Sequence, residues 1–332
     1  MNFFSIPLVA TAISIIICWA LFAILCSLLH EAVAQIKAER GRFMKKYLLQ
    51  QLQDFPNGVN WASLIYQHGT IDLLSRAPNK PTNDITSSLF AETLVDVVGK
   101  VHLVQMNLAP GQNRYQQPSL YNFKAATELL KPSDVVSFFK QAMTSAELNA
   151  PDGNGTIYES EVYKNLIQNI EKWYCEFQER LTLWYKKKTR QRLFLLGFLL
   201  GLLLNIDSIQ LFNIFNKDTT ARNQVMSFYQ QHADDLNRVA NRVTVNVPVD
   251  STTQSLDSLL RQTKAYATQM DSLSKAAALP VGVQYSVLRS QNRPSVGLAL
   301  LKILGALISG LAASFGAPFW FDLLRKAYSK NV

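Results

Sequence analysis

Residues 7–29 read PLVATAISIIICWALFAILCSLL and contain no charged side chain. As a helix that rises 1.5 Å per residue, this run is roughly 34 Å long, enough to cross the hydrocarbon layer of a bilayer. A cleaved signal peptide is the rival interpretation, but no basic residue precedes the run, its apolar part is too long, and no small-x-small site precedes Glu31 and Lys37. We therefore predict a first transmembrane helix within residues 1–30.

Two further apolar stretches are long enough to span a membrane. They read LFLLGFLLGLLLNIDSIQLFNIF (193–215) and VGLALLKILGALISGLAASFGAPFWF (296–321). The former becomes half polar after its first twelve residues, and the latter holds one charge, Lys302, before a Pro-Phe-Trp-Phe cluster that resembles an interfacial aromatic belt. Only 17% of the chain is charged, against about 25% in soluble domains. We predict transmembrane helices over 191–215 and 296–322.

Basic residues beside the three stretches predict the orientation, because Lys and Arg are retained on the cytoplasmic side of a membrane. One set of flanks holds Lys37, Arg40, Arg42, Lys45, Lys46, Lys186, Lys187, Lys188, Arg190, Arg192, Arg325, Lys326 and Lys330, whereas the opposite set holds only Lys217, Arg222, Arg289 and Arg293. We therefore predict an N-terminus outside and a C-terminus in the cytoplasm. Residues 31–190 are then a cytoplasmic domain, 216–295 a periplasmic module and 323–332 a basic cytoplasmic tail.

The net charge of +9 also invites a nucleic-acid interpretation. Most of the excess lies beside the predicted spans, however, and no RRM, KH, zinc-finger or helix-turn-helix pattern accompanies it. Anionic lipid headgroups account for the same clusters, at about 1 kcal/mol per basic residue near the surface. We therefore predict no nucleic-acid partner, and headgroup contacts for Lys186, Lys187, Lys188, Arg190 and Arg192.

The predicted cytoplasmic domain has a helical pattern almost throughout, and the lack of alternating runs predicts no sheet. The first apolar helix continues without a break to Asp54, where a Phe-Pro-Asn-Gly sequence ends it. Residues 76–84 and 107–122 are loops by composition. An uninterrupted pattern from Thr156 to about Gln191 predicts one rod that enters the second span, with an apolar face of Leu166, Ile170, Trp173, Phe177, Leu181 and Trp184. That face is predicted to pack in a core, with a partner-binding groove as the alternative.

The predicted outer module is polar, with a loop over 245–253. A heptad spacing then runs for two and a half repeats through Leu256, Leu259, Thr263, Tyr266, Met270 and Leu273. Because a coiled coil needs about three or four heptads, we predict an antiparallel hairpin with 226–243 and keep an intermolecular coil as the alternative.

The sequence contains no complete catalytic or metal-binding signature. The segment from Asp152 to Thr156 begins like an EF-hand loop, but Ile157 stands where Gly is needed and Tyr163 where Glu is needed. The four histidines have no metal-ligand spacing, and there is no P-loop, nucleophile elbow, HExxH or dinucleotide fingerprint. We therefore predict no catalytic residue, cofactor or metal site, although a site built from distant residues leaves no linear trace.

Two charged residues lie inside predicted spans. By helical rise, Asp207 and Lys302 are roughly 12 Å and 10 Å from the outer ends of their spans. Ionisable groups in a bilayer usually pair or line a water-filled path. We predict that the second and third spans pack together, with Asp207 paired to Lys302 and Asn205 hydrogen-bonded nearby. The alternative is that both charged side chains snorkel to the outer interface.

Small residues at four-residue steps predict that these helices pack closely. Gly197 and Gly201 form one such pair, and Gly310 lies between Ala306 and Ser314 in a second row. The sequence leaves open whether the partner helix belongs to the same chain or to another copy.

Three stretches carry a resemblance to known proteins: EKWYCEFQERLTLWYKKKTR (171–190), LLGLLLNIDSIQL (199–211) and FGAPFWFDLLRK (315–326). Together they resemble an uncharacterised family of bacterial inner-membrane proteins. The chain departs from that family at Tyr66-Gln67-His68-Gly69, where the family has Tyr-x-His-Pro, and at Leu183, where it has Gly. The resemblance implies three spans, a helical cytoplasmic domain and a bacterial inner-membrane location, but no activity.

These patterns together predict an all-α integral membrane protein with three transmembrane helices, a helical cytoplasmic domain and a small helical outer module. We predict an anchor or scaffold that couples the cytoplasmic domain to the periplasmic module, with an unknown protein partner or as a homo-oligomer. The alternative is a pore or transporter component lined by the polar half of the second span. An enzyme would need a pocket built by the loops at 76–84 and 107–122.

Overall fold

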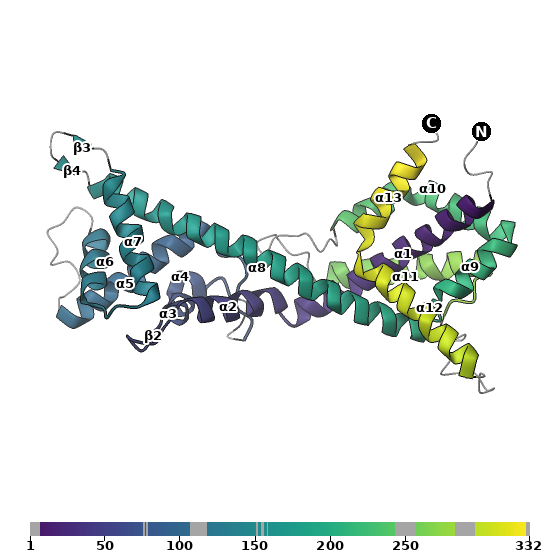
Figure 1. Cartoon of the computed structure of the whole chain (residues 1–332), viewed down its shortest axis with the longest axis horizontal. Coiled ribbons are helices and arrows are strands. Elements are labelled where there is room, and N and C mark those ends of the chain that lie inside the picture. The colour runs from purple at the N-terminus through teal and green to yellow at the C-terminus, as the bar shows by residue number, and fades with distance from the viewer. Residues whose placement is uncertain are drawn as a thin grey trace. The chain divides into compact units, whose positions relative to one another are not determined.

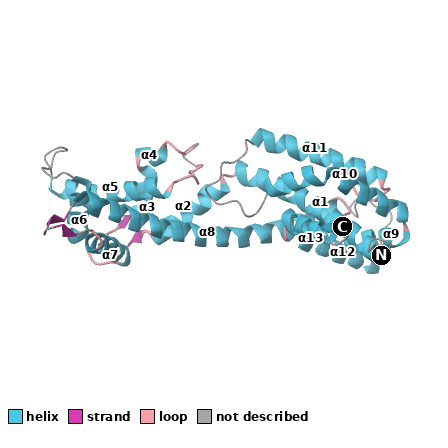
Figure 2. Ribbon diagram, turned by 90° about the horizontal axis from the view of Figure 1, so that it is seen from above, coloured by secondary structure: helices cyan, strands magenta, loops and turns pink. Residues whose placement is uncertain are grey.

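The computed structural model describes residues 7–75, 77, 79–106, 118–150, 152–153, 156–157, 159–242, 256–282 and 296–329. Nearly all of the described chain is helical (Figure 2), which confirms the all-α class. It divides into two compact units: unit 1 comprises the described residues up to 36 and from 185 onwards, and unit 2 comprises those from 37 to 184. The loop predicted over 245–253 and most of that over 107–122 lie outside the described residues.

Unit 1 is built around α1 (Pro7–Ile36), the helix that the longest apolar run forms. Its neighbours in Figure 1 are α9 (Ser208–Lys217), α10 (Thr219–Arg242), α11 (Leu256–Ala276), α12 (Val296–Ser314) and α13 (Ala317–Ser329). Most side chains of α1 between Ile17 and Leu28 are buried, because the surrounding helices turn apolar faces toward them. The rings of Trp19 and Trp320 lie 5.0 Å apart in this core.

Helices α10 and α11 pack along α1 and do not form the separate outer module that we predicted. The Tyr266 hydroxyl donates to the carbonyl of Leu21, in the middle of α1, over 2.9 Å. Leu259, Tyr266 and Leu273 of the heptad seam are buried in this contact. The difference has a simple cause: an amphipathic seam shows that a helix buries one face, but not which helix covers it.

Helix α8 (Glu159–Leu203) is uninterrupted and belongs to unit 2 as far as residue 184 and to unit 1 from residue 185. This confirms the predicted rod. Trp184, which we placed on the buried face, is 49% exposed and packs against Tyr47. The buried positions, which recur every three or four residues, are Leu166, Ile170, Tyr174, Phe177, Leu181 and Tyr185. The face is therefore part of the core. It differs from the predicted face at two positions, where Tyr174 and Tyr185 are buried in place of Trp173 and Trp184.

Unit 2 has an aromatic core. Besides the first part of α8, it contains α2 (Glu39–Gln51), α3 (Trp61–Gln67), α4 (Gly69–Asp72), α5 (Ser87–Met106), α6 (Pro118–Leu129) and α7 (Asp134–Leu148). Phe90 stacks on Tyr174 with ring centroids 4.1 Å apart, and Trp61 meets Phe139 edge-on at 5.6 Å. The buried Tyr174 hydroxyl in this core donates to the carbonyl of Ile85 over 3.2 Å.

Unit 2 also contains short strands, although we predicted no sheet. β1 (Gln53–Asp54) pairs antiparallel with β2 (Val59–Asn60), and β3 (Asp152–Gly153) pairs antiparallel with β4 (Thr156–Ile157). Each ladder is two residues long and closes a turn. Such ladders are too short for the alternation by which strands are recognised in a sequence.

The first apolar helix does not continue to Asp54 as predicted. It ends at Ile36, and α2 begins after Ala38, whose φ of 46° is left-handed. This conformation costs an ordinary residue roughly 1–2 kcal/mol, and no Gly or Pro announces it in the sequence. Beyond the break, Gly41 brings α2 against the carbonyl of Pro81, where any Cβ would collide.

Among the described residues, α1 alone is a single helix long and apolar enough to cross a membrane, which is consistent with a membrane protein. The other two predicted spans are bent. The α8–α9 pair bends by 59°, and the pair formed by α12 and α13 bends by 87°, so each counts as a span only if both parts are taken together. Gly316, with φ 81°, makes the second turn. It directs Trp320 and Phe321 into the core of unit 1, where we had predicted an interfacial belt.

Candidate functional site

Buried polar groups gather in unit 1 where α8 ends and α9 begins. Leu203 is the last residue of α8, and Asn205 then adopts a left-handed backbone with φ 54°. The amide of Ile206 donates to the carbonyl of Gly201 over 2.8 Å, the Schellman arrangement that closes a helix at a left-handed residue. Asn is one of the few residues besides Gly that adopts this conformation readily. The bend is therefore specified locally.

The Asn205 side chain, 6% exposed, joins three segments of unit 1. Its Oδ1 accepts a hydrogen bond from Lys302 Nζ on α12 over 3.1 Å. Its Nδ2 donates to the carbonyl of Pro280, which follows α11, over 2.8 Å, and to Gln210 Oε1 over 3.2 Å. One amide thus holds the bend, the end of α11 and α12 together.

Asp207 does not form the predicted ion pair with Lys302. Its Oδ1 accepts hydrogen bonds from the amides of Ile209, at 2.8 Å, and Gln210, at 3.2 Å, so it is the N-cap of α9. A carboxylate is also favoured there by the positive end of the helix dipole. The side chain lies against Gly305, where a Cβ would collide with it. The positions of Asp207 and Lys302 along their spans correctly predicted that these two segments meet. The acceptor of the Lys302 ammonium is nevertheless Asn205, two residues before Asp207.

Hydroxyl groups extend this network to α1. The Oγ atoms of Ser208 and Ser309 are 2.7 Å apart, and Trp19 Nε1 on α1 donates to Ser208 Oγ over 2.9 Å. None of these three residues was predicted as part of a site. A signal was present, since a Trp in the middle of an apolar helix needs an acceptor for its indole N–H.

The three glycines predicted to mediate helix packing lie where α8 meets α12. A Cβ on Gly310 would lie 2.9 Å from the nitrogen of Phe198, and one on Gly197 would lie 2.8 Å from Ala313 Cβ. Gly201 faces Ala306 at 3.5 Å. Both helices belong to the same chain, and the missing side chains let their backbones approach.

The five basic residues predicted to contact lipid headgroups lie on α8, just beyond the point where the helix passes from unit 2 to unit 1. All are at least partly exposed: Lys186, Lys187, Lys188, Arg190 and Arg192. Along the helix they precede the apolar stretch that begins at Leu193.

The polar groups at the bend between α8 and α9 have a structural role. They include an ammonium, a carboxylate, amides and hydroxyls, each bonded to another protein group. Within the described residues, no three His, Cys, Asp or Glu side chains could hold a metal ion together. The named groups fix the angle between α8 and α9, and they form no pairing of a nucleophile with a base.

No family model matches the chain, and neither does any curated protein or any solved structure. The resemblance to a bacterial inner-membrane family therefore stays a prediction. A function has to be inferred from the residues and contacts of this chain.

Substitutions of Asp207 distinguish an N-cap from an ion pair. Asp207→Asn should be tolerated, because Asn caps helices as well as Asp does, whereas Asp207→Ala should lower the free energy of unfolding by about 1 kcal/mol. Chemical unfolding in a mild detergent, followed by circular dichroism, measures both. Equal destabilisation by Asn and Ala would show that the charge is essential and that the capping interpretation is wrong.

Proposed function

We propose that this chain is an integral protein of a bacterial inner membrane that serves as an anchor or scaffold. The three proposed spans are α1, the bent α8–α9 pair and the bent α12–α13 pair. The observation that carries the proposal is an exposed apolar face on α8 and α12, on the same unit as a helix apolar enough to cross a membrane.

This face consists of leucines that no other part of the described chain covers. On α8 they recur every four residues, and on α12 they share the helix with the glycine contact. Their exposed fractions lie between 44% and 61% for Leu195, Leu199, Leu203, Leu300, Leu304 and Leu311. Exposing these apolar side chains to water costs free energy, and contact with lipid removes that cost.

The scaffold role rests on α8. It is one uninterrupted helix whose residues up to 184 belong to unit 2 and whose later residues belong to unit 1, so the chain passes from one unit to the other within a helix. The basic residues on α8 suit the cytoplasmic leaflet, which favours unit 2 as the cytoplasmic domain. A protein partner or a second copy of the chain would then bind outside the bilayer.

A pore or transport component is the second candidate, and the exposed charges of α11 favour it. The Tyr266 bond to Leu21 holds α11 beside the middle of α1. Lys264 and Asp271 are exposed on α11. If α1 crosses a bilayer, such charges cannot face lipid and must meet water or protein. A water-filled path or an oligomeric contact satisfies this requirement.

Cysteine labelling tests the proposed arrangement. In a variant with Cys18, Cys26 and Cys175 replaced by Ala, a cysteine at Asn216 should react with an impermeant maleimide added to intact spheroplasts, because the neighbouring Phe215 carbonyl accepts a hydrogen bond from Thr11 near the start of α1. A cysteine at Thr144 on α7 should react only after permeabilisation. Both original residues are exposed, so access in the folded chain is not limiting. Labelling of both sites from one side, or release of the protein from membranes by carbonate, would overturn the proposal.

Ion flux from liposomes separates the two candidates. A scaffold should give no flux above that of empty liposomes. A pore should give flux that changes when the charge at Lys264 is reversed by Lys264→Glu. The purified full chain serves for both measurements.

A further inference from the structure

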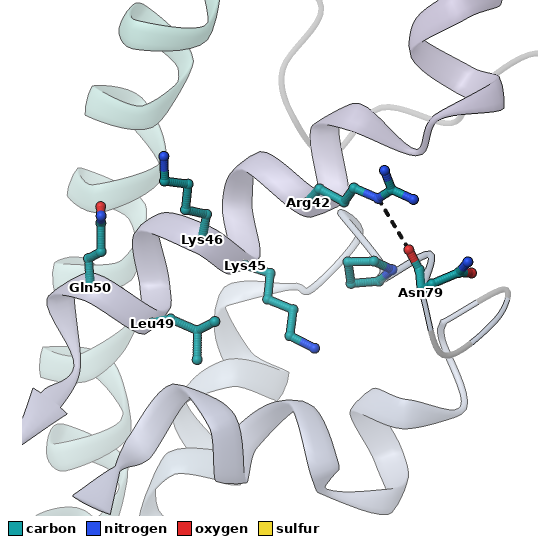
Figure 3. A pocket seen from close by; sticks show the side chains of 7 residues that line it. Arg42, Lys45, Lys46, Leu49, Gln50 and Asn79 are labelled. Carbon is teal, nitrogen blue, oxygen red and sulfur yellow. Dashed lines mark hydrogen bonds between the residues drawn. The ribbon is translucent and has the colours of Figure 1, made fainter.

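A basic pocket lies on α2, within unit 2. It has a volume of about 450 Å³ and is lined by Arg42, Lys45, Lys46, Leu49, Gln50, Asn79 and Pro81 (Figure 3). Three of these seven residues are cations and none is acidic. The whole pocket is formed by one helix and the segment around Pro81, so it does not depend on unit 1.

The local sequence explains how this pocket forms. Arg42, Lys45 and Lys46 are three and four residues apart, which places them on one side of α2. Gly41 allows the chain around Pro81 to approach the same helix. The carbonyl of Asn79 then accepts a hydrogen bond from Arg42 Nε over 3.2 Å (Figure 3), which fixes the guanidinium beside the pocket.

The three cations have no acidic partner among the described residues. The terminal nitrogens of Arg42 form no hydrogen bond or ion pair there, since its one bond is made by Nε. Lys45 Nζ lies 5.0 Å from the centre of the Tyr66 ring, and Lys46 Nζ lies 5.9 Å from that of Tyr47. Burial raises the pKa of the Tyr66 phenol, so the ring stays neutral and does not cancel the charge of Lys45.

We propose that this pocket binds a phosphate group. A guanidinium with free terminal nitrogens and two ammonium groups matches the charge and the acceptor oxygens of a phosphate ester. The amide side chains of Gln50 and Asn79 add neutral hydrogen-bonding groups to the lining. The volume suits one headgroup or one small phosphorylated molecule.

Two sources share this chemistry. Arg42 lies only six residues beyond Ile36, the end of α1, so a phospholipid headgroup at the membrane surface is one source. A soluble phosphate ester is the other. The inference does not rest on the scaffold function, because it uses contacts of unit 2 alone.

The test uses the full chain in a neutral detergent with inorganic pyrophosphate as the probe, titrated calorimetrically at low salt. Arg42→Gln with Lys45→Gln should weaken binding at least tenfold, since two of the three cations are lost. The matched control is Lys140→Gln with Lys172→Gln, which removes the same charge from exposed positions of the same unit and should change binding less than twofold. Leu49→Trp keeps every charge but fills the pocket, and it should also weaken binding at least fivefold.

The outcomes are decisive in both directions. Displacement of pyrophosphate by short-chain phosphatidylglycerol, but not by phosphatidylcholine, identifies a lipid headgroup. Binding of pyrophosphate without such displacement identifies a soluble phosphate ester. No binding by the wild type overturns the proposal, and so does a control pair that loses as much affinity as the pocket pair. If the pocket pair fails to fold, Leu49→Trp decides, and wild-type affinity in that variant likewise overturns the proposal.

Discussion

Gly310→Leu is expected to prevent α8 from packing against α12 and to remove most of the folded protein. A Cβ at this position would lie 2.9 Å from the nitrogen of Phe198 and 3.0 Å from the carbonyl oxygen of Phe194. Both are backbone atoms that no rotamer change can move. Overpacking typically costs about 1–3 kcal/mol, so Gly310→Ala should lose that much, and leucine, with three more carbon atoms in the same space, should lose more.

Gly297 provides the matched control, because it lies on the same helix and a Cβ there would meet no atom within 4 Å. Gly297→Leu should therefore accumulate as the wild type does. The measurement is the amount of monodisperse protein that size-exclusion chromatography recovers from solubilised membranes. Equal losses at both positions would mean that α12 tolerates no leucine at a glycine, and the close contact would not explain the result.

The glycines of this helix contact could be predicted from sequence, although the sequence left open which helix they meet. Gly197, Gly201 and Gly310 permit close approach because they lack a side chain, which is a property of the residues themselves. The rod of α8 could be predicted for a similar reason, since its apolar period runs without a breaker. Features that depend on one helix alone are thus available from the sequence.

The bend between α8 and α9 could also have been predicted from the sequence. It was missed because the high apolar content of 193–215 indicated one continuous span. Asn205 is a residue that ends helices in a left-handed conformation, and Asp207 is a residue that begins them. Two residues apart, they mark one helix ending and another starting. A hydropathy window averages over such signals, because it counts composition and ignores order.

Other features could not be predicted, because they depend on which segments meet. Asn205 and Asp207 both have a side-chain oxygen that could accept a hydrogen bond from Lys302. The packing of α12 places the ammonium at Asn205. The seam of α11 shows one buried face, and only the tertiary fold places Tyr266 on Leu21 of α1. The left-handed Ala38 has no local signal, so the boundary after α1 was missed as well.

Asn205 is the centre of the candidate site, because it accepts the hydrogen bond from Lys302. A charged acceptor at this position would pair more strongly with the ammonium, but an amide can both accept and donate. Asn205 uses both abilities, since it accepts from Lys302 and donates to Pro280 and Gln210. Neither Asp nor Leu at this position could form all of those hydrogen bonds while adopting the left-handed backbone.

Asn205→Ala is accordingly expected to lower the free energy of unfolding of unit 1 by about 2–5 kcal/mol. Roughly 1–2 kcal/mol comes from a left-handed backbone that alanine resists, and about 1–3 kcal/mol from polar groups of Lys302 and Pro280 left without a partner. Asn205→Gly separates the two contributions, because glycine accepts the backbone and loses only the hydrogen bonds.

The buried thiol of Cys26, fully inaccessible in unit 1, supplies the measurement for this pair of variants. With Cys18 replaced by Ala and Cys175 by Ser, Cys26 is the one thiol left, and the rate at which a maleimide labels it reports the opening of unit 1. Asn205→Ala should label fastest, Asn205→Gly less fast, and the wild type slowest. Adding Lys302→Met to Asn205→Ala should restore part of the protection, because the stranded ammonium is removed along with its missing acceptor. Identical rates in the wild type and Asn205→Ala would show that this amide does not hold the three segments together.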